Sequence, residues 1–585
     1  MKKMRSLALL FSLIIFSLII WMTASPATGA EGTEHPAVPS DVLTVSGVVT
    51  NAQGKPVKEV ELDFYVNGKK VEMEEEVLTG KIGMYAAEIR LHHGTLPGAT
   101  VTIEASKPSY KTTERMTLDK IAPEPGGPAE NGDAYYMTHH SFTLMRAITP
   151  AFWIATIMLV LVYVLIAFEM MHRTLAALLG AALLLTISYT AGTFNPDYMI
   201  LSFEDAMHAI DMNVIFLLMA MMMIVGILKK TGVFQWMAYK SYQAAKGNVY
   251  ALSAILMVVT AVTSAFLDNV TTMLLIIPVT IEIALTLKIN PIAFLMPEVF
   301  ASNVGGTATL IGDPPNIMIG SYAKLSFLDF AHNLTIICAI SMAFTVVYYI
   351  YWYKKEYLTA QVGDVQKLIA HLKEEYRITD SKLLIQGGVI LAIVIFLFII
   401  HGALHMEPSV AALIGAAVLM AVSRVDIVEM LEHEIEWPTL VFFMMLFIVV
   451  AGAEEAGLIQ VIAEWVKDMS QGSLVAAILM ILWVSAIASA IIDNIPFTAT
   501  MLPIVGYLTT VIPGAQGGVL WWALALGACL GGNGTMIGAS ANVVTVGMAE
   551  RAGYHISFMQ YMKTAALPML VTIVLCSIWL LLVEI

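Results

Sequence analysis

Charged residues are scarce in this chain. Lys, Arg, Asp and Glu make up 13% of its 585 residues and hydrophobic residues 58%, and the mean hydropathy is +0.77. Soluble domains are about 25% charged, so the composition excludes a soluble core and indicates a polytopic membrane protein. The chain has no basic patch, which excludes nucleic acid as a partner.

Cysteine is also scarce, and metal-binding and nucleotide-binding patterns are lacking. Cys338, Cys529 and Cys576 lie in apolar segments, where we interpret them as small buried hydrophobic residues. The paired histidines at 92–93 and 139–140 lack partner ligands at metal-binding spacing. The run GGNGT at 531–535 lacks the Lys of a phosphate-binding loop. We therefore expect no enzyme activity, no cofactor and no resident metal.

The N-terminal part of the chain predicts an exported β-domain. Residues 1–30 combine a basic start, an apolar run and small residues, which is typical of a signal peptide or an uncleaved signal anchor. Residues 41–145 contain short alternating segments separated by turns such as Asn67-Gly68, and these predict a β-sandwich. The pattern GVVTNAQGKPVKEVELDFYV resembles carboxypeptidase regulatory-like and transthyretin-like domains.

The rest of the chain divides into two similar halves, 148–353 and 383–585, joined by a charged linker, 354–382, that we expect to be cytoplasmic. Each half is expected to contain five spans, an amphipathic segment along the membrane surface, and a hairpin that enters and returns on the same side. In the first half the spans are 148–168, 175–188, 214–228, a broken 291–321 and 334–353, the surface segment is 233–246 and the hairpin is 249–287. In the second half the spans are 383–400, 410–422, 439–450, a broken 519–548 and 565–582, the surface segment is 458–467 and the hairpin is 473–507.

The distribution of basic residues gives an orientation. With the β-domain outside the cell membrane, nearly all Lys and Arg residues of the membrane part fall on the cytoplasmic side. The exceptions are Arg146, Lys324 and Lys467. This excess of basic residues on the cytoplasmic side is what the positive-inside rule requires. An odd number of spans in each half inverts the second repeat relative to the first. The two hairpins are then expected to enter from opposite sides and to meet near the midplane.

Two pairs of matched motifs mark the two halves. Asp268–Pro278 reads DNVTTMLLIIP and Asp493–Pro503 reads DNIPFTATMLP. An aspartate in such an apolar run costs about 2.5–3.5 kcal/mol, so its recurrence in matching surroundings indicates function. Downstream, Asn303–Asn316 (NVGGTATLIGDPPN) matches Leu530–Asn542 (LGGNGTMIGASAN). A polar hairpin and a glycine-broken helix in each half are typical of secondary transporters.

These motifs supply the candidate ion-binding residues. They are Asp268, Asn269, Thr271, Asn303, Gly305, Gly306, Thr309, Asp313, Asn316, Asp493, Asn494, Thr498, Gly531, Gly532, Asn533, Thr535 and Asn542. We expect the glycines to let the chain leave helical geometry, because irregular backbone in a membrane is tolerated where it lines protein or a watery cavity. We expect the Asp-Asn pairs to bind transported Na⁺, since carboxylate and amide oxygens suit a hard cation. A buried carboxylate that binds either Na⁺ or a proton is the simplest chemistry for exchange.

Two further acids occur in the first half alone. Asp313 matches Ala539 and Glu298 matches Leu524 in the second half. Asp313 either caps the following half-helix or binds substrate. Glu298 either pairs with a neighbour such as Lys288 or is a proton site. In the opposing structural interpretation, Gly, Asn and Thr only mediate close helix packing, which explains the glycines but not two Asp-Asn pairs.

The motifs also carry a family resemblance. DNVTTMLLIIPVTIEIAL, EVFASNVGGTATLIGDPPNI, DNIPFTATMLP and GACLGGNGTMIGASANVV resemble the ArsB/NhaD permease family, with its citrate transporter-like fold, and within it members like the melanosomal P protein. The resemblance runs from about residue 148 to the C-terminus. It implies inverted repeats and a homodimer with a scaffold and a moving transport domain. In the wider superfamily the hairpin tips carry Ser-Asn-Thr and bind Na⁺ and a carboxylate, whereas Asp268 and Asp493 replace that Ser here.

We therefore predict a secondary ion transporter of the cell membrane that exchanges Na⁺ for H⁺, with a lipid bilayer and a small ion as its partners. The aspartates at the hairpin tips favour proton or sodium coupling over dicarboxylate transport. One alternative is an anion permease for arsenite, chloride or an organic anion such as a carboxylate. Another is a sensor that no longer transports and whose β-domain binds an extracellular ligand.

Overall fold

The computed structural model describes residues 40–583 except positions 52, 53, 55, 59, 74, 75, 81, 108, 109, 120, 124–133, 146 and 361–375. The expected signal segment, residues 1–30, lies outside the described residues. So does the middle of the linker between the two halves. The chain forms two compact units, one made of most of the N-terminal strands and one that contains every helix among the described residues.

The N-terminal strands form two sheets, which confirms the β-rich character expected for this region. The first sheet orders β4 (Met84–His92), β1 (Ser40–Asn51), β8 (Ala134–His139) and β7 (Ala122–Pro123), with β9 (Phe142–Leu144) also paired to β1. The second orders β3 (Lys69–Lys70), β2 (Glu61–Val66), β5 (Val101–Ser106) and β6 (Met116–Thr117). Side chains along β4 and β5 alternate between buried and accessible positions. This period of two buries one face of each strand, as the sequence pattern predicts.

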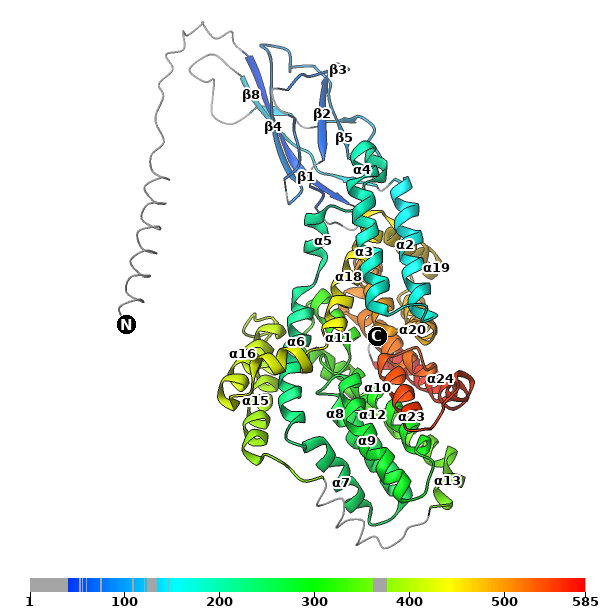
Figure 1. Ribbon diagram of the computed structural model, residues 1–585. Coiled ribbons are helices and arrows are strands. Elements are labelled where there is room, and N and C mark those ends of the chain that lie inside the picture. Colours follow the sequence, from blue (N-terminus) through cyan, green and yellow to red (C-terminus); the bar gives the residue numbers. More distant parts are fainter. Residues whose placement is uncertain are drawn as a thin grey trace, which may run out of the picture. The chain divides into compact units, whose positions relative to one another are not determined.

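The helices of the first half follow the expected order (Figure 1). They are α2 (Pro150–Ala167), α3 (Arg173–Tyr189), α4 (Ala191–Phe194), α5 (Phe203–Ala209), α6 (Met212–Lys229), α7 (Val233–Ala245), α8 (Val249–Ser264), α9 (Asn269–Thr286), α10 (Ile292–Thr307), α11 (Pro314–Ala323), α12 (Phe327–Trp352) and α13 (Lys354–Leu358). α8 and α9 are the two arms of the hairpin. α10 and α11 are the two parts of the broken helix.

The helices of the second half repeat this order. They are α15 (Ser381–Ile400), α16 (Pro408–Ser423), α17 (Ile427–Glu429), α18 (Trp437–Glu455), α19 (Leu458–Ser470), α20 (Leu474–Ile491), α21 (Asn494–Val511), α22 (Val519–Gly531), α23 (Ser540–Arg551) and α24 (Phe558–Val583). The start points of the short helices α7 and α19 also match. α7 begins after Gly232 and α19 after Gly457, each with a left-handed backbone (φ 75° and 94°) that glycine adopts readily.

The outer helices of each half pack against a helix of the other half. α2 and α3 of the first half pack against α18 of the second, and α15 and α16 of the second half pack against α6 of the first. Figure 1 shows α15 and α16 beside α6. Every residue of α10 and α22 is buried. The broken helices are therefore enclosed by protein, where irregular backbone is tolerated.

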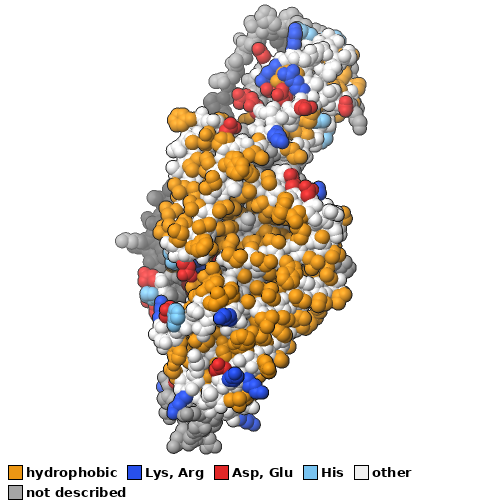
Figure 2. Space-filling model, turned by 90° about the vertical axis from the view of Figure 1, so that its right-hand side faces the viewer, with side chains coloured by type: hydrophobic (Ala, Val, Ile, Leu, Met, Phe, Trp, Pro, Cys, Tyr) orange, Lys and Arg blue, Asp and Glu red, His pale blue; other side chains and the backbone are white. Residues whose placement is uncertain are grey.

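The helical surface is apolar, as a bilayer requires. Figure 2 shows a broad band of hydrophobic side chains over the helices of one face, with basic side chains gathered near the lower end of the helices. Among the described residues, nine helices are long and apolar enough to cross a membrane, and two of these are the hairpin arms α9 and α20. α16 and the individual parts of the broken helices are shorter than this. The expected path of ten spans therefore stays a prediction.

Candidate functional site

Each hairpin turns at the predicted aspartate. Asp268 accepts hydrogen bonds from the backbone N–H groups of Val270 and Thr271, both at 3.0 Å, and so caps α9. Asp493 accepts one from the N–H of Ile495 at 3.0 Å and caps α21. Short capping side chains satisfy N–H groups that have no partner within the helix. The two carboxylates are thus fixed at the N-termini of the returning arms.

The breaks in α10–α11 and α22–α23 are held by matched threonines and asparagines. Thr309 donates to the carbonyl of Ala265 at the end of the first hairpin arm, and Thr535 donates to that of Ala490 in the second. The Asn316 amide donates to the carbonyls of Thr307 and Thr309, at 3.0 and 2.8 Å. The Asn542 amide bonds the carbonyls of Gly532 and Thr535 in the same way. These predicted ligands therefore hold the irregular backbone in place.

The glycines have a different role from the one expected. Gly305 and Gly531 lie within the last turns of α10 and α22, so they do not release the chain from helical geometry. A Cβ on Gly305 would lie 2.1 Å from the carbonyl oxygen of Ala261, and one on Gly531 would lie 2.4 Å from the Cα of Ala486. Each glycine instead lets a broken helix touch the backbone of a hairpin arm, which is the close packing that the structural interpretation expected.

Gly306 and Gly532 pack on the other side of the same turns. A Cβ at either position would meet the carbonyl of Gly312 or Gly538, at 2.5 and 2.6 Å. Both glycines are therefore needed where the chain doubles back on itself. In the first half the helix α10 continues past Gly306 to Thr307, whereas in the second half α22 ends at Gly531 and a 3₁₀ turn follows at Gly532–Gly534, where the sequence predicted the change.

Asn303 joins the two halves through a chain of side-chain amides. Its Nδ2 donates to Oδ1 of Asn533 at 2.9 Å and to Oδ1 of Asn542 at 3.0 Å, and its Oδ1 accepts from Nδ2 of Asn269 at 3.0 Å. The donor directions follow from the network, because Asn542 uses its own Nδ2 on backbone carbonyls and must present Oδ1. The Nδ2 of Asn533 is left buried without a partner.

Asp313 lies at the centre of the site. It is 1% exposed, and both its oxygens lie 3.4 Å from Nδ2 of Asn494 on the second hairpin. Its side chain makes no capping bond to α11, whose first two residues are prolines without N–H donors. Of the two roles left open by the sequence, capping is therefore wrong. Asp313 also lies within electrostatic range of Asp268 and Asp493.

Asp493 has a basic partner that the sequence analysis missed. Nη1 of Arg173, at the start of α3, lies 3.5 Å from Oδ2 of Asp493 and also donates to Ser540. Nη2 of Arg173 donates to Thr439 at 3.2 Å, and Ser540 donates to Asp493 at 2.9 Å. Arg173 thus connects helices α3 and α18 to the second hairpin and the second broken helix. Among the described residues, neither Asp268 nor Asp313 has such an ion pair.

A cleft of about 500 Å³ gives access to this ion pair. Its lining includes Arg173, Asp493 and Ser540, together with Glu436 just before α18 and Val270 on the first turn of α9. Glu436 lies within electrostatic range of Asp268 and Arg173. Asp313 is not among the residues that line the cleft.

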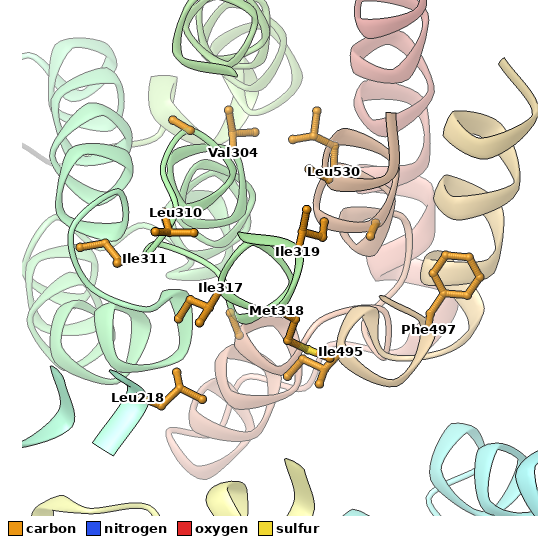
Figure 3. Close-up of a cluster of buried hydrophobic side chains, with 14 of the residues drawn as sticks. Leu218, Val304, Leu310, Ile311, Ile317, Met318, Ile319, Ile495, Phe497 and Leu530 are labelled. Carbon is orange, nitrogen blue, oxygen red and sulfur yellow. The ribbon is translucent and has the colours of Figure 1, made fainter. Parts of the chain in front are cut away.

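Apolar side chains surround these polar groups. Figure 3 shows Met318 of α11 pointing toward Ile495 at the start of α21, and Ile319 lying toward Leu530 of α22. All four residues are buried. In such surroundings a carboxylate without a counter-charge is costly. Asp313 is therefore expected to hold a cation or a proton.

The remaining predicted residues are Thr271 and Thr498 at the starts of the returning hairpin arms and Glu298 in α10. Thr271 lies beside Asp268 in the first turn of α9, and Thr498 donates its hydroxyl to the carbonyl of Asn494 within its own helix. Glu298 is buried in α10 and accepts a hydrogen bond from Thr280, and of the two roles left open by the sequence, pairing with Lys288 is not found among the described residues. Among the described residues, no three His, Cys, Asp or Glu side chains are placed to hold one metal ion.

Comparison with known proteins identifies the family. A family model described as "Citrate transporter" matches residues 163–527, more than half of the chain. The chain belongs to the citrate transporter family. An uncharacterized transporter of Mycobacterium tuberculosis is 41% identical over 432 residues, which cover 73% of this chain and 97% of the relative. The P protein of Homo sapiens is 37% identical over 493 residues, covering 72% of this chain and 58% of that protein.

This family membership agrees with the resemblance found in the motifs and makes the chain a membrane transporter, not an enzyme. A solved structure, the Alcanivorax borkumensis YdaH transporter, covers 70% of this chain and 98% of its own, at 15% identity and a TM-score of 0.45.

Arg173, Ser540, Glu436 and Cys529 are the site residues that sequence analysis missed. Arg173 reads as an ordinary basic residue of a cytoplasmic loop, and Ser540 as the match of Pro314. Cys529 matches Asn303, and its thiol donates to Oδ1 of Asn316 at 3.6 Å just as Asn303 donates to Asn542. A residue-by-residue alignment of the two halves would have identified Cys529 as a site residue, because it occupies the position of Asn303.

Proposed function

We propose that this transporter exchanges Na⁺ for H⁺ across the cell membrane. The chain would act as a homodimer with its β-domain (41–145) outside, inverted repeats at 148–353 and 383–585, and a cytoplasmic linker at 354–382. Na⁺ would bind to the Asp-Asn pairs at the hairpin tips, Asp268–Asn269 and Asp493–Asn494, and at Asp313. Protons would replace it there.

The observation that carries this proposal is the charge of the site. The carboxylate of Asp313 lies within electrostatic range of Asp268 and Asp493, and that of Glu436 lies within range of Asp268, while Arg173 pairs with Asp493 and both Arg173 and Lys229 lie within range of Glu436. If the carboxylates are ionised, the site is strongly negative. A negative, amide-rich site selects a hard cation and repels an anion.

The two hairpins would have unequal roles. Asp268 caps its helix and pairs with no basic side chain in the described part of the chain, whereas Asp493 forms an ion pair with Arg173. A cation that reaches Asp493 through the cleft must displace the guanidinium. Arg173 would therefore hold the empty second hairpin against α3 and α18, and release it when Na⁺ binds.

One observation favours a second candidate, an anion permease. The buried Nδ2 of Asn533 has no hydrogen-bond partner among the described residues, and an unpaired amide donor is suited to an oxyanion. The name of the matching family model points the same way. In this alternative Arg173 would bind the anion, so its removal would weaken substrate binding.

Sodium-driven proton movement in proteoliposomes with an internal pH dye tests the proposal. The variants are Asp268→Asn, Asp493→Asn and Asp313→Asn, with Asp211→Asn as the matched control, because Asp211 caps α6 in the same way. Asn caps a helix about as well as Asp, so the site variants remove charge and keep the cap. We expect wild type and the control to exchange ions and at least one site variant to lose exchange. Wild type without sodium-dependent flux would refute antiport, and the vesicles would then be screened with arsenite, chloride and carboxylates.

A further inference from the structure

The buried acid Glu298 lies outside the cluster around Asp313. It is 1% exposed in the middle of α10. Its Oε1 accepts a hydrogen bond from the hydroxyl of Thr280 on α9 at 3.0 Å, and its Oε2 is buried without a partner. Among the described residues, no Lys, Arg or His forms an ion pair with it. A buried carboxylate in this situation is neutralised by a proton or a bound cation.

The second half shows that the fold does not need this acid. In the matching positions, Leu524 on α22 replaces Glu298 and Val505 on α21 replaces Thr280. Both replacements are fully buried (0% exposed), and α21 and α22 pack together as α9 and α10 do. An apolar pair therefore serves the same packing. Replacing buried ionic groups by apolar residues of similar volume is often neutral or stabilising, so the packing of α9 against α10 does not by itself require Glu298 and Thr280.

The position of Glu298 along α10 suits a relay toward the central site. Ala293 precedes it by five residues and Asn303 follows it by five, each about 7.5 Å along the helix axis. At Ala293, the carbonyl accepts from the hydroxyl of Tyr357, which also bonds Ser253 on α8. At Asn303 the amide chain that joins the two halves begins. Glu298 thus lies between a buried pair of hydroxyl groups and the predicted ion-binding residues.

Few titratable groups can influence Glu298. Tyr357 on α13 lies within electrostatic range of it. Among the described residues, the titratable side chains of Tyr250 on α8, Tyr349 on α12, Cys529 on α22, Glu550 on α23 and Tyr561 on α24 make no hydrogen bond or ion pair with Glu298. A proton is therefore the expected neutralising group.

We propose that Glu298 is a separate proton-binding residue of this transporter, loaded and unloaded during the transport cycle independently of the cation at the hairpin tips. This inference rests on the proposed exchange of Na⁺ for H⁺. The carboxylate takes one proton on Oε2 from water and returns it to water at another stage, so no other reactant is needed. The first half would then have this additional proton-binding residue, and the second half, with Leu524 in its place, would not.

The test uses the full chain and the variants Glu298→Gln and Glu298→Leu with Thr280→Val. The double variant gives the first half the residues of the second, so we expect it to fold, as checked by gel filtration and thermal unfolding. Glu550→Gln, at an exposed acid on α23, is the control. The first measurement is the infrared difference spectrum between low and high pH. We expect one carboxylic-acid C=O band to be missing in both Glu298 variants and present in the control.

The second measurement is sodium-driven proton flux together with binding of radioactive Na⁺. We expect both Glu298 variants to lose at least tenfold in flux while Na⁺ binding stays within twofold of wild type. Unchanged infrared bands, or wild-type flux and pH dependence in the double variant, would overturn the inference. If wild type itself shows no sodium-driven flux, the proposed exchange fails, and the infrared spectra still decide whether Glu298 takes up a proton.

Discussion

Replacing Arg173 by Gln distinguishes a cation site from an anion site. If Na⁺ competes with Arg173 for Asp493, the variant removes the competitor and Na⁺ binds more tightly. If the substrate is an anion, the variant removes a ligand and the substrate binds more weakly. The two functions therefore predict changes of opposite direction from one substitution.

The structure sets the size of the effect. The Arg173 and Asp493 side chains are 25% and 11% exposed, so solvent screens their interaction only partly. Hydrogen bonds that involve a charged group contribute about 1.5–3 kcal/mol. A 1.4 kcal/mol difference is a factor of about ten in affinity. We therefore expect the Na⁺ concentration for half-maximal proton flux to fall by about tenfold.

The assay is proton flux in proteoliposomes at a series of Na⁺ concentrations, for wild type and Arg173→Gln. Arg551→Gln is the control, because Arg551 is an exposed arginine at the end of α23 and does not line the cleft. We expect the control to match wild type. An unchanged or higher Na⁺ requirement in Arg173→Gln would refute the competition between the guanidinium and the cation.

Three further predictions follow from particular contacts. Gly305→Ala forces a Cβ against the backbone of a hairpin arm and should lower the free energy of unfolding by about 1–3 kcal/mol or more. Gly547→Ala is the control, because its Cβ meets no atom within 4 Å and its thermal unfolding midpoint should stay nearly unchanged. Equal midpoints in the two variants would contradict the packing role of Gly305. Asp313→Asn should preserve the fold and reduce sodium-driven proton flux at least tenfold; a flux equal to wild type would show that this carboxylate is not part of the pathway. Burial of Asp41 opposes its ionisation, but backbone donors such as the N–H of Leu96 lower the pKa of Asp41 below its usual 3.8. The charge of Asp41 therefore stabilises the β-strands above about pH 3.8 and ceases to do so as the pH falls through the lower pKa of the folded state. Asp41→Asn should make these strands more sensitive to protease at neutral pH. A difference between variant and wild type that persists unchanged in acid would disprove this.

The sequence by itself determined the membrane class, the two repeats, the hairpin turns and the family. Each of these depends on local patterns, because an aspartate that caps a helix and a glycine that interrupts an apolar run can be recognised within a dozen residues. The residue-by-residue match of the two halves also predicted that Asp313 and Glu298 have no counterparts. These features need no knowledge of which helices touch.

Tertiary structure alone decided how the site is assembled. Arg173 meets Asp493 across 320 positions of sequence, and Asn303 joins Asn533 and Asn542 in the other half. It also decided that Gly305 is a packing residue and that Asp313 is not a cap. The physical reason is that helix packing brings together side chains from distant segments, and neither spacing nor composition records which buried groups then find a partner and which are left to bind an ion.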